Sequence, residues 1–111
     1  SPFYDDFIDF VNKIPVATTC KLKVNMNPRT HKIIEHGLHT DLPYRCKTGI
    51  LYLNTNDGYT IFEDGTKIES VENRFVSFDS NIKHSGTSCT NQQVRLVVNI
   101  NYFAPDLHIN N

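Results

Sequence analysis

The sequence predicts a mainly β protein: a double-stranded β-helix, or jelly roll, of about eight short strands, with one α-helix at its N-terminal end. Most of the chain alternates apolar and polar residues with the period of two that is typical of half-buried strands. Short groups of Asn, Asp, Gly and Pro separate these segments, as in strands joined by tight turns. Helical spacing of apolar residues occurs in residues 1–15. A small barrel is the alternative arrangement of the same strands.

The length and composition are those of one ordinary globular domain. The chain has 111 residues, of which 39% are hydrophobic and 21% are charged, and its net charge is −1. We therefore treat residues 1–111 as a single domain. The near-neutral charge provides no broad basic surface, so nucleic acid is not expected as a partner. No run approaches the roughly 18 apolar residues of a membrane helix, so no membrane partner is expected either.

The three cysteines, Cys20, Cys46 and Cys89, are widely spaced. Their odd number and their spacing fit free thiols in a reducing compartment better than a disulfide framework. None forms the Cys-x-x-Cys pair of a structural zinc site. We expect all three to be buried as small apolar residues in a cytoplasmic protein.

Residues 1–15 are predicted to form the α-helix. Ser1 and Pro2 suit the N-cap and the first helical position, and Pro15 ends the pattern. The apolar residues between them form one stripe, which we expect to pack against the outside of a sheet. These residues are Phe3, Phe7, Phe10, Val11 and Ile14.

Residues 18–104 are predicted to form the jelly-roll core. In its first strand, Leu22, Val24 and Met26 alternate with polar residues, so we expect this apolar side to be the buried one. The predicted strands are residues 20–26, 33–41, 46–54, 59–63, 66–71, 74–78, 82–89 and 94–103. Turns are predicted at residues 27–29, 56–58, 64–65 and 72–73.

The segment from His39 to Asp41 is the candidate centre of a functional site. Side chains at positions i and i+2 of a strand leave the same face, so this histidine and this carboxylate can converge on one point. Such a pair suits a divalent first-row metal, and a second histidine would complete a triad with open coordination positions. We take His84 as that third ligand. His-x-Asp also occurs by chance, so the assignment depends on the residues around it.

Three further histidines are predicted not to bind the metal. His36 lies at an odd offset from His39, so on a strand it would face the opposite side. His31 and His108 lie near a turn and near the C-terminal end of the sequence, where we expect them to be solvated.

Arg95 lies at the start of the largely apolar segment of residues 94–103 and is its one charged residue. Burying a charge without a partner is costly. Either the head of Arg95 extends into solvent from the strand end, or its planar guanidinium binds a carboxylate through two parallel hydrogen bonds.

Taken in order, His39-x-Asp41, His84 and Arg95 resemble the pattern of the iron(II)- and 2-oxoglutarate-dependent dioxygenases. The resemblance covers about residues 33–103.

Two further segments are similar to the prolyl 4-hydroxylase branch of that family. Tyr-Leu-Asn at residues 52–54 precedes Gly-Tyr-Thr-Ile-Phe at residues 58–62, which is similar to a Gly-Gly-x-Thr-x-Phe segment. The second glycine of that segment is replaced by Asp57 or Tyr59, depending on the alignment. The short form of the chain resembles bacterial and phage members.

The resemblance implies a role for each matching residue. His39, Asp41 and His84 would bind Fe(II), whereas Arg95 and Tyr52 would bind the distal carboxylate of the cosubstrate 2-oxoglutarate. Oxygen would be the second cosubstrate, with ascorbate as a reductant.

Arg45 and Asn101 are candidate substrate residues. Arg45 matches a substrate-binding arginine of oxygen-sensing relatives, and Asn101 stands where those relatives carry an aromatic residue.

The function implied by the resemblance is hydroxylation of an unactivated C–H bond, in a prolyl or similar residue of a peptide or protein. Two alternatives stay open: the same chemistry on a free amino acid or small metabolite, and a non-enzymatic metal-binding jelly-roll module. The partner is accordingly a peptide, protein or small-molecule substrate. We expect a monomer or weak homodimer in the cytoplasm of a bacterium or of an infected host cell.

Overall fold

The structure, a computed structural model, describes residues 18–41 and 45–103, with side chains from Lys21 onward. The predicted helix of residues 1–15, the side chain of Cys20 and His108 lie outside the described residues. The described residues form seven strands: β1 (Thr18–Pro28), β2 (Lys47–Tyr52), β3 (Tyr59–Phe62), β4 (Lys67–Glu69), β5 (Phe75–Asp79), β6 (His84–Ser85) and β7 (Val94–Phe103).

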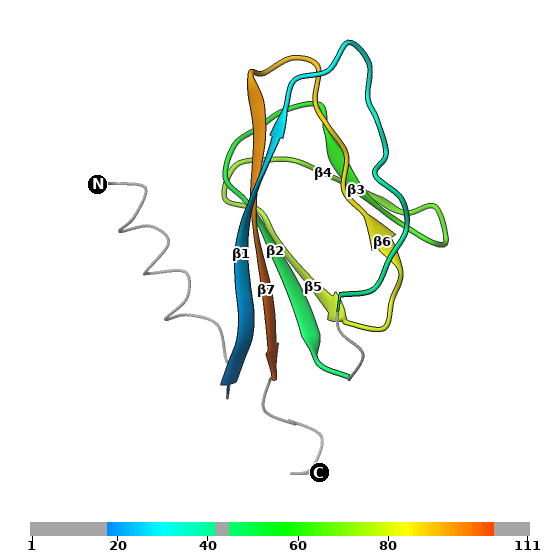
Figure 1. Cartoon of the computed structure of the whole chain (residues 1–111), viewed down its shortest axis with the longest axis vertical. Helices are drawn as coiled ribbons and strands as arrows, with labels where there is room; N and C mark the ends of the chain where they lie inside the picture. The colour runs from blue at the N-terminus through cyan, green and yellow to red at the C-terminus, as the bar shows by residue number, and fades with distance from the viewer. Residues whose placement is uncertain (1–17, 42–44, 104–111) are drawn as a thin grey trace, which may run out of the picture.

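The strands form two antiparallel sheets that lie face to face (Figure 1). One sheet has four strands in the order β1-β7-β2-β5, and the other has three in the order β4-β3-β6. Except for β3 and β4, neighbouring strands in the sheets are distant in the sequence, as β1 and β7 show. This is a mainly β, double-sheet architecture consistent with the predicted jelly roll. The described part of the chain contains no helix.

The longest predicted strand matches the structure best. Residues 94–103 form β7 with the predicted bounds, because every second residue is apolar and the segment contains no Gly or Pro. The predicted turns at residues 64–65 and 72–73 are also confirmed. Gly65 and Asn73 have φ angles of +92° and +70°, which glycine and asparagine tolerate better than other residues.

Residues 33–41 form no regular strand, so that prediction was wrong. These residues make two isolated bridges to the segment that contains β6. One bridge joins Glu35 to Thr87, and the other joins His39 to His84. Gly37 interrupts the ladder with a φ of +107°. The N–H of Gly37 donates to the hydroxyl oxygen of Ser85, and the N–H of Ile34 donates to the hydroxyl oxygen of Ser88. Side-chain oxygens thus replace the carbonyls of a regular ladder. The predicted strand of residues 82–89 contracts to β6 for the same reason.

The core is divided between the two faces of the four-stranded sheet. Between the sheets, Ile50, Tyr52, Phe78 and Val97 form one buried cluster, against which residues of the second sheet pack. Successive strand residues alternate in direction. The opposite face therefore carries a second cluster: Leu51, Val98, Ile100 and Tyr102.

Strand β1 has the opposite orientation to the predicted one. Leu22, Val24 and Met26 are 42%, 50% and 68% exposed, although their alternation predicted burial. The register pairs Val24 with Val98, so these apolar side chains share the outer face of the sheet. The polar residues between them point inward, because the interior at this edge is a polar pocket and not a packed core.

Cys46 and Cys89 are free and buried, as predicted. Within the described ranges, we found no helix with the length and apolar character needed to cross a lipid bilayer.

Candidate metal centre

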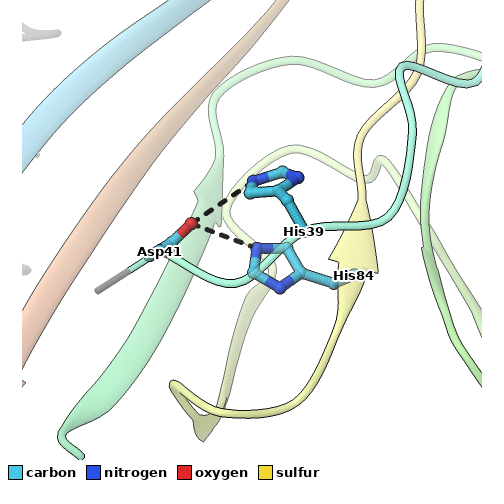
Figure 2. Close-up of side chains that lie close together, drawn as sticks. All are labelled: His39, Asp41 and His84. Atoms are coloured by element: carbon cyan, nitrogen blue, oxygen red, sulfur yellow. Dashed lines mark ion pairs between the residues drawn. The ribbon is translucent and has the colours of Figure 1, made fainter. Parts of the chain in front are cut away.

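The structure brings the side chains of His39, Asp41 and His84 together, so that they point toward one another (Figure 2). One ligand atom from each lies within 4.8 Å of the other two. The two histidines exchange backbone hydrogen bonds, from His39 N to His84 O at 2.9 Å and from His84 N to His39 O at 3.0 Å. This isolated bridge puts the imidazole rings side by side, with centroids 4.7 Å apart. Backbone pairing therefore joins two segments that are far apart in the sequence.

Each histidine is oriented by a backbone carbonyl two residues before it. Nδ1 of His39 donates to the carbonyl of Gly37 at 3.2 Å, and Nδ1 of His84 donates to the carbonyl of Ile82 at 3.1 Å. A carbonyl can only accept, so the proton of the neutral ring lies on Nδ1. The lone pair of each Nε2 atom is then available for a metal.

Asp41 presents one carboxylate oxygen to the histidines and the other to hydrogen-bond donors. Its Oδ1 lies 3.3 Å from Nε2 of His39 and 3.5 Å from Nε2 of His84. Its Oδ2 accepts from Nδ2 of Asn101 at 3.1 Å and from Oγ1 of Thr48 at 3.3 Å. Because Oδ2 is occupied, Asp41 is arranged to bind a metal through Oδ1 alone.

The two donors are held by the sheet itself. Thr48 on β2 and Asn101 on β7 are direct partners in the register, and Nδ2 of Asn101 also donates to Oγ1 of Thr48 at 2.9 Å. Both side chains are buried. Asn101, which was predicted as a substrate residue, thus donates a hydrogen bond to the candidate metal ligand Asp41. Sequence reasoning missed Thr48, whose only signal is a polar residue at an inward position of a buried strand.

The electrostatics keep Asp41 ionised. The His84 imidazole beside the carboxylate, helped by Asn101, outweighs burial and holds the pKa of Asp41 well below its usual range. Burial opposes protonation of His84, but the neighbouring Asp41 and the Ile82 carbonyl outweigh it and raise the pKa of His84 above its ordinary value. An ionised carboxylate next to two imidazoles is a suitable donor set for a divalent cation.

The residues fit a first-row metal. Nε2 of His84 is buried and makes no hydrogen bond among the described residues. With the ring proton on Nδ1, its contact with Oδ1 of Asp41 at 3.5 Å brings two lone pairs together, which is costly unless a cation binds both atoms. With metal–ligand bonds of about 2.1 Å, neighbouring ligand atoms lie roughly 3 to 3.4 Å apart. The two distances from Oδ1 of Asp41, 3.3 and 3.5 Å, are close to that range. Two histidines and one carboxylate with open positions are typical of non-haem iron sites.

Arg95 is buried and not at the surface, with 2% of its area exposed. Its side chain, together with His39 and His84, lines a pocket of about 250 Å³. The guanidinium donates to Oγ of Ser70 at 3.0 Å and to two backbone carbonyls. No carboxylate pairs with it in the part of the chain that the structure describes. The interpretation with the head in solvent is therefore excluded.

Of the two glycines beside this arginine, Gly58 and Gly86, only Gly58 is needed to make room for it. A Cβ at Gly58 would lie 2.6 Å from Cδ of Arg95 and 2.6 Å from the carbonyl oxygen of Ser88, closer than real Cβ atoms approach. A Cβ at Gly86 would lie 3.4 Å from Nη1 of Arg95, an ordinary contact. Gly58 is thus required because the arginine side chain occupies the space beside it.

Tyr52 lies behind the pocket wall. It is fully buried, and its hydroxyl donates to Oγ1 of Thr60 at 2.7 Å. Burial raises the pKa of Tyr52. Thr60, and not Tyr52, lines the pocket with Arg95. Sequence reasoning did not assign a role to Thr60, although the threonine of the segment at residues 58–62 was the signal for it.

Two other predicted positions lie elsewhere than expected. Nη2 of Arg45 pairs with Oδ2 of Asp79 at 3.4 Å, and its side chain is 78% exposed and does not line the pocket of Arg95. His36 lines the pocket of Arg95, although it was predicted to face away. The positive φ of Gly37 breaks the alternation between His36 and His39, which explains the error. His36 is not part of the ligand cluster.

A second pocket, of about 190 Å³, lies on the Asp41 side of the triad. It is lined by Lys21, Lys23, Asn25, His39, Thr40, Asp41, Asn99 and Asn101.

Comparison with known proteins supports the fold. The structure is similar to a cupin protein from Bacteroides fragilis, with a TM-score of 0.61 over 81% of this chain and 70% of that chain, at 14% identity. It also resembles an RmlC-like cupin protein from Desulfovibrio desulfuricans, with a TM-score of 0.48 over 73% of this chain and 82% of the other, at 11% identity. The first likeness shows a cupin-type jelly roll, and the second is too weak to add to it.

The sequence itself matches no protein-family model and no curated protein. Both structural neighbours are described only as cupin proteins. The dioxygenase resemblance and its prolyl 4-hydroxylase branch therefore stay predictions.

Proposed function

We propose that this protein is an iron(II)- and 2-oxoglutarate-dependent dioxygenase that hydroxylates an unactivated C–H bond. One observation carries the proposal: Arg95 is buried without a carboxylate partner among the described residues, and it lines the same pocket as His39 and His84. A buried cation is costly unless an anion compensates it. A site that only holds a metal has no need of such a cation beside it.

In this proposal the triad holds the metal. Nε2 of His39, Oδ1 of Asp41 and Nε2 of His84 would bind Fe(II) and leave further positions open for ligands. Asn101 and Thr48 keep Asp41 from using both oxygens. The bound metal, with 2-oxoglutarate and oxygen, supplies an oxidative decarboxylation that yields succinate and transfers one oxygen atom to a C–H bond.

Arg95 and Thr60 would bind the far carboxylate of the cosubstrate. The planar guanidinium suits a carboxylate through two parallel hydrogen bonds. Oγ1 of Thr60 accepts from Tyr52 at 2.7 Å and from Nη2 of Arg95 at 3.5 Å, so its own hydrogen is free to donate into the pocket. Tyr52 would then act through Thr60, and its ring lies 5.8 Å from the Arg95 guanidinium carbon. Ascorbate would keep the iron reduced.

The test measures succinate formation from 2-oxoglutarate by the purified protein with Fe(II) and ascorbate. The same preparation is loaded with Mn(II), which takes the same ligands without turnover, and its melting temperature is measured with and without 2-oxoglutarate. We expect slow succinate formation without added substrate and a higher melting temperature. Absence of both would reject the proposal.

The alternative is a non-enzymatic metal-binding cupin module. The cluster of His39, Asp41 and His84 and the cupin-type fold support it equally. It predicts that Mn(II) raises the melting temperature and that 2-oxoglutarate adds nothing.

A further inference from the structure

Two pockets meet at the triad. His39, Lys23, Asn25 and Asn99 line both of them. Arg95 lines only the larger pocket, whereas Lys21, Asp41 and Asn101 line only the smaller one. The smaller pocket, which we call the β1 pocket, lies on the Asp41 side of the candidate metal site, and it is not lined by Arg95 or Thr60, the residues proposed to bind the cosubstrate.

The β1 pocket is polar and positively charged. Every described residue that lines it has a side chain with a polar or charged group, and none has a purely hydrocarbon side chain. Lys21 and Lys23 supply two positive charges, and neither pairs with a carboxylate in the described ranges. The one acidic residue, Asp41, carries a negative charge that a divalent metal held by the triad would compensate. An anionic group is therefore the complementary occupant.

Strand β1 is inverted in order to build this pocket. Lys21, Lys23 and Asn25 alternate with apolar residues and point inward, and the register places Lys21 opposite Asn101 and Lys23 opposite Asn99. The neighbouring Met26 is 68% exposed on the outer face. Lys21 and Lys23 are exposed and line the pocket, whereas Val24 lies on the outer face opposite Val98, a member of the buried cluster on that face. The polar face of β1 is therefore the one that faces the candidate metal site.

Asn99 adds a second requirement. Its Oδ1 atom is buried and has no hydrogen-bond partner among the described residues. Asn99 lies on β7 next to Lys23 and lines both pockets. A ligand that carries an N–H or O–H group close to an anionic group would satisfy this oxygen.

We propose that the β1 pocket binds the primary substrate, and that this substrate is a small hydrophilic carboxylic acid with an N–H or O–H donor beside the carboxylate. Lys21 and Lys23 face the carboxylate, and Oδ1 of Asn99 accepts from the donor. The inference rests on the proposed function for the reaction, whereas the binding itself depends only on the pocket. An internal prolyl residue of a peptide lacks both the free carboxylate and the N–H, and its apolar ring finds no apolar wall there.

The test uses Mn(II)-loaded protein with 2-oxoglutarate and calorimetry. The probes are the L-amino acids, the corresponding 2-hydroxy acids, and the carboxamides of both series. We expect at least one acid to bind and its carboxamide to bind about tenfold more weakly. Lys21→Gln should lower the affinity for that acid by about tenfold. Lys32→Gln, a change at an exposed lysine outside both pockets, should not alter its affinity.

Three results would overturn the proposal: binding of no acid, equal binding of acid and carboxamide, or unchanged affinity in Lys21→Gln. The 2-oxoglutarate affinity is measured in the same variants, because Lys21 does not line the Arg95 pocket and should leave it unchanged. Acid binding that depends on Lys21, in a protein that forms no succinate and is not stabilised by 2-oxoglutarate, would reject the dioxygenase and keep the pocket. Succinate formation without acid binding would keep the dioxygenase and reject the β1 pocket as the substrate site.

Discussion

Asn101 donates a hydrogen bond from Nδ2 to Oδ2 of Asp41 at 3.1 Å, and this contact decides which carboxylate oxygen faces His39 and His84. The donor comes from the centre of the four-stranded sheet, where β7 pairs with both β1 and β2. Asp41 belongs to a segment with little regular structure. The rigid sheet therefore orients a ligand that its own segment could not hold in one direction.

Replacing Asn101 should weaken metal binding. In Asn101→Leu the Oδ2 atom of Asp41 loses a donor, and we expect the Mn(II) dissociation constant to rise by roughly 10- to 100-fold. Calorimetry on the folded variant measures this. Asn81→Leu, at an exposed position, is the control and should bind as the wild type does. Equal affinities in the two variants would show that Asn101 does not position Asp41.

Removing a ligand should abolish metal binding without unfolding the protein. We expect His39→Ala and Asp41→Ala to lose Mn(II) binding and to keep the circular dichroism of a β protein. His36→Ala is the matched control, because His36 lines the larger pocket but is not in the ligand cluster. Iron-dependent activity that survives in both ligand variants would mean that the ligands are misassigned.

Arg95→Lys should separate cosubstrate binding from metal binding. Lysine keeps the charge but lacks the planar fork, so 2-oxoglutarate affinity should fall by about tenfold or more while Mn(II) affinity is retained. Arg45→Ala serves as the control for cosubstrate binding, because Arg45 is exposed and pairs with Asp79. A rise in substrate KM in Arg45→Ala, with unchanged 2-oxoglutarate affinity, is the result that its predicted substrate role requires.

Gly58→Ala should destabilise the fold near Arg95. The added methyl would contact both Cδ of Arg95 and a backbone oxygen at 2.6 Å, and overpacking of this kind costs about 1–3 kcal/mol. Gly86→Ala meets only an ordinary contact and should cost clearly less. Denaturant unfolding of the two variants checks the order, and a reversed order would contradict the packing described around Arg95.

Above pH 6.5, the stability of the metal-free protein and its affinity for metal should depend on pH in opposite ways. The lowered pKa of Asp41 contributes stability that is present above its ordinary value of 3.8 and is lost as pH falls through the lowered value. The raised pKa of His84 contributes stability that is present below 6.5 and is lost as pH rises through the raised value. Without metal, this pair should therefore stabilise the protein most between these two ordinary values.

Metal binding requires neutral imidazole, so its affinity should rise with pH and level off above the raised pKa of His84. Below that pKa, proton competition at this one site changes the affinity by about tenfold per pH unit. Unfolding and Mn(II) titrations at several pH values measure both effects. The Asp41→Asn variant should show a flatter stability profile, and an unchanged profile would rule out the pair as its source.

The sequence was sufficient for the parts of the site that depend on local spacing. His39 and Asp41 are two residues apart, and an extended backbone of any regularity brings such side chains to one side. Strand β7 was predicted with its bounds because its alternation is long and uninterrupted. The partnership with His84 needed the family pattern, because nothing local specifies which distant segment forms the bridge.

The errors have a common physical cause. Alternation shows that two faces of a strand differ, but not which face is inside, and in β1 the polar face lines a pocket. Residues an odd number of positions apart on a strand face opposite sides, and this rule placed His36 wrongly. The positive φ at Gly37 interrupts the alternation between His36 and His39. Thr48 and Thr60 act through hydrogen bonds to residues of other strands, which spacing does not reveal.

The bridge between His39 and His84 has a further consequence. It consists of two backbone hydrogen bonds outside any longer ladder, so the segment that carries His39 and Asp41 is joined to β6 more weakly than one strand to the next. A metal held by both segments would act as a cross-link and close the intervening chain into a loop. Like a disulfide, it would reduce the entropy of the unfolded chain. Amide hydrogen exchange in residues 33–41 should then report whether the cross-link is present.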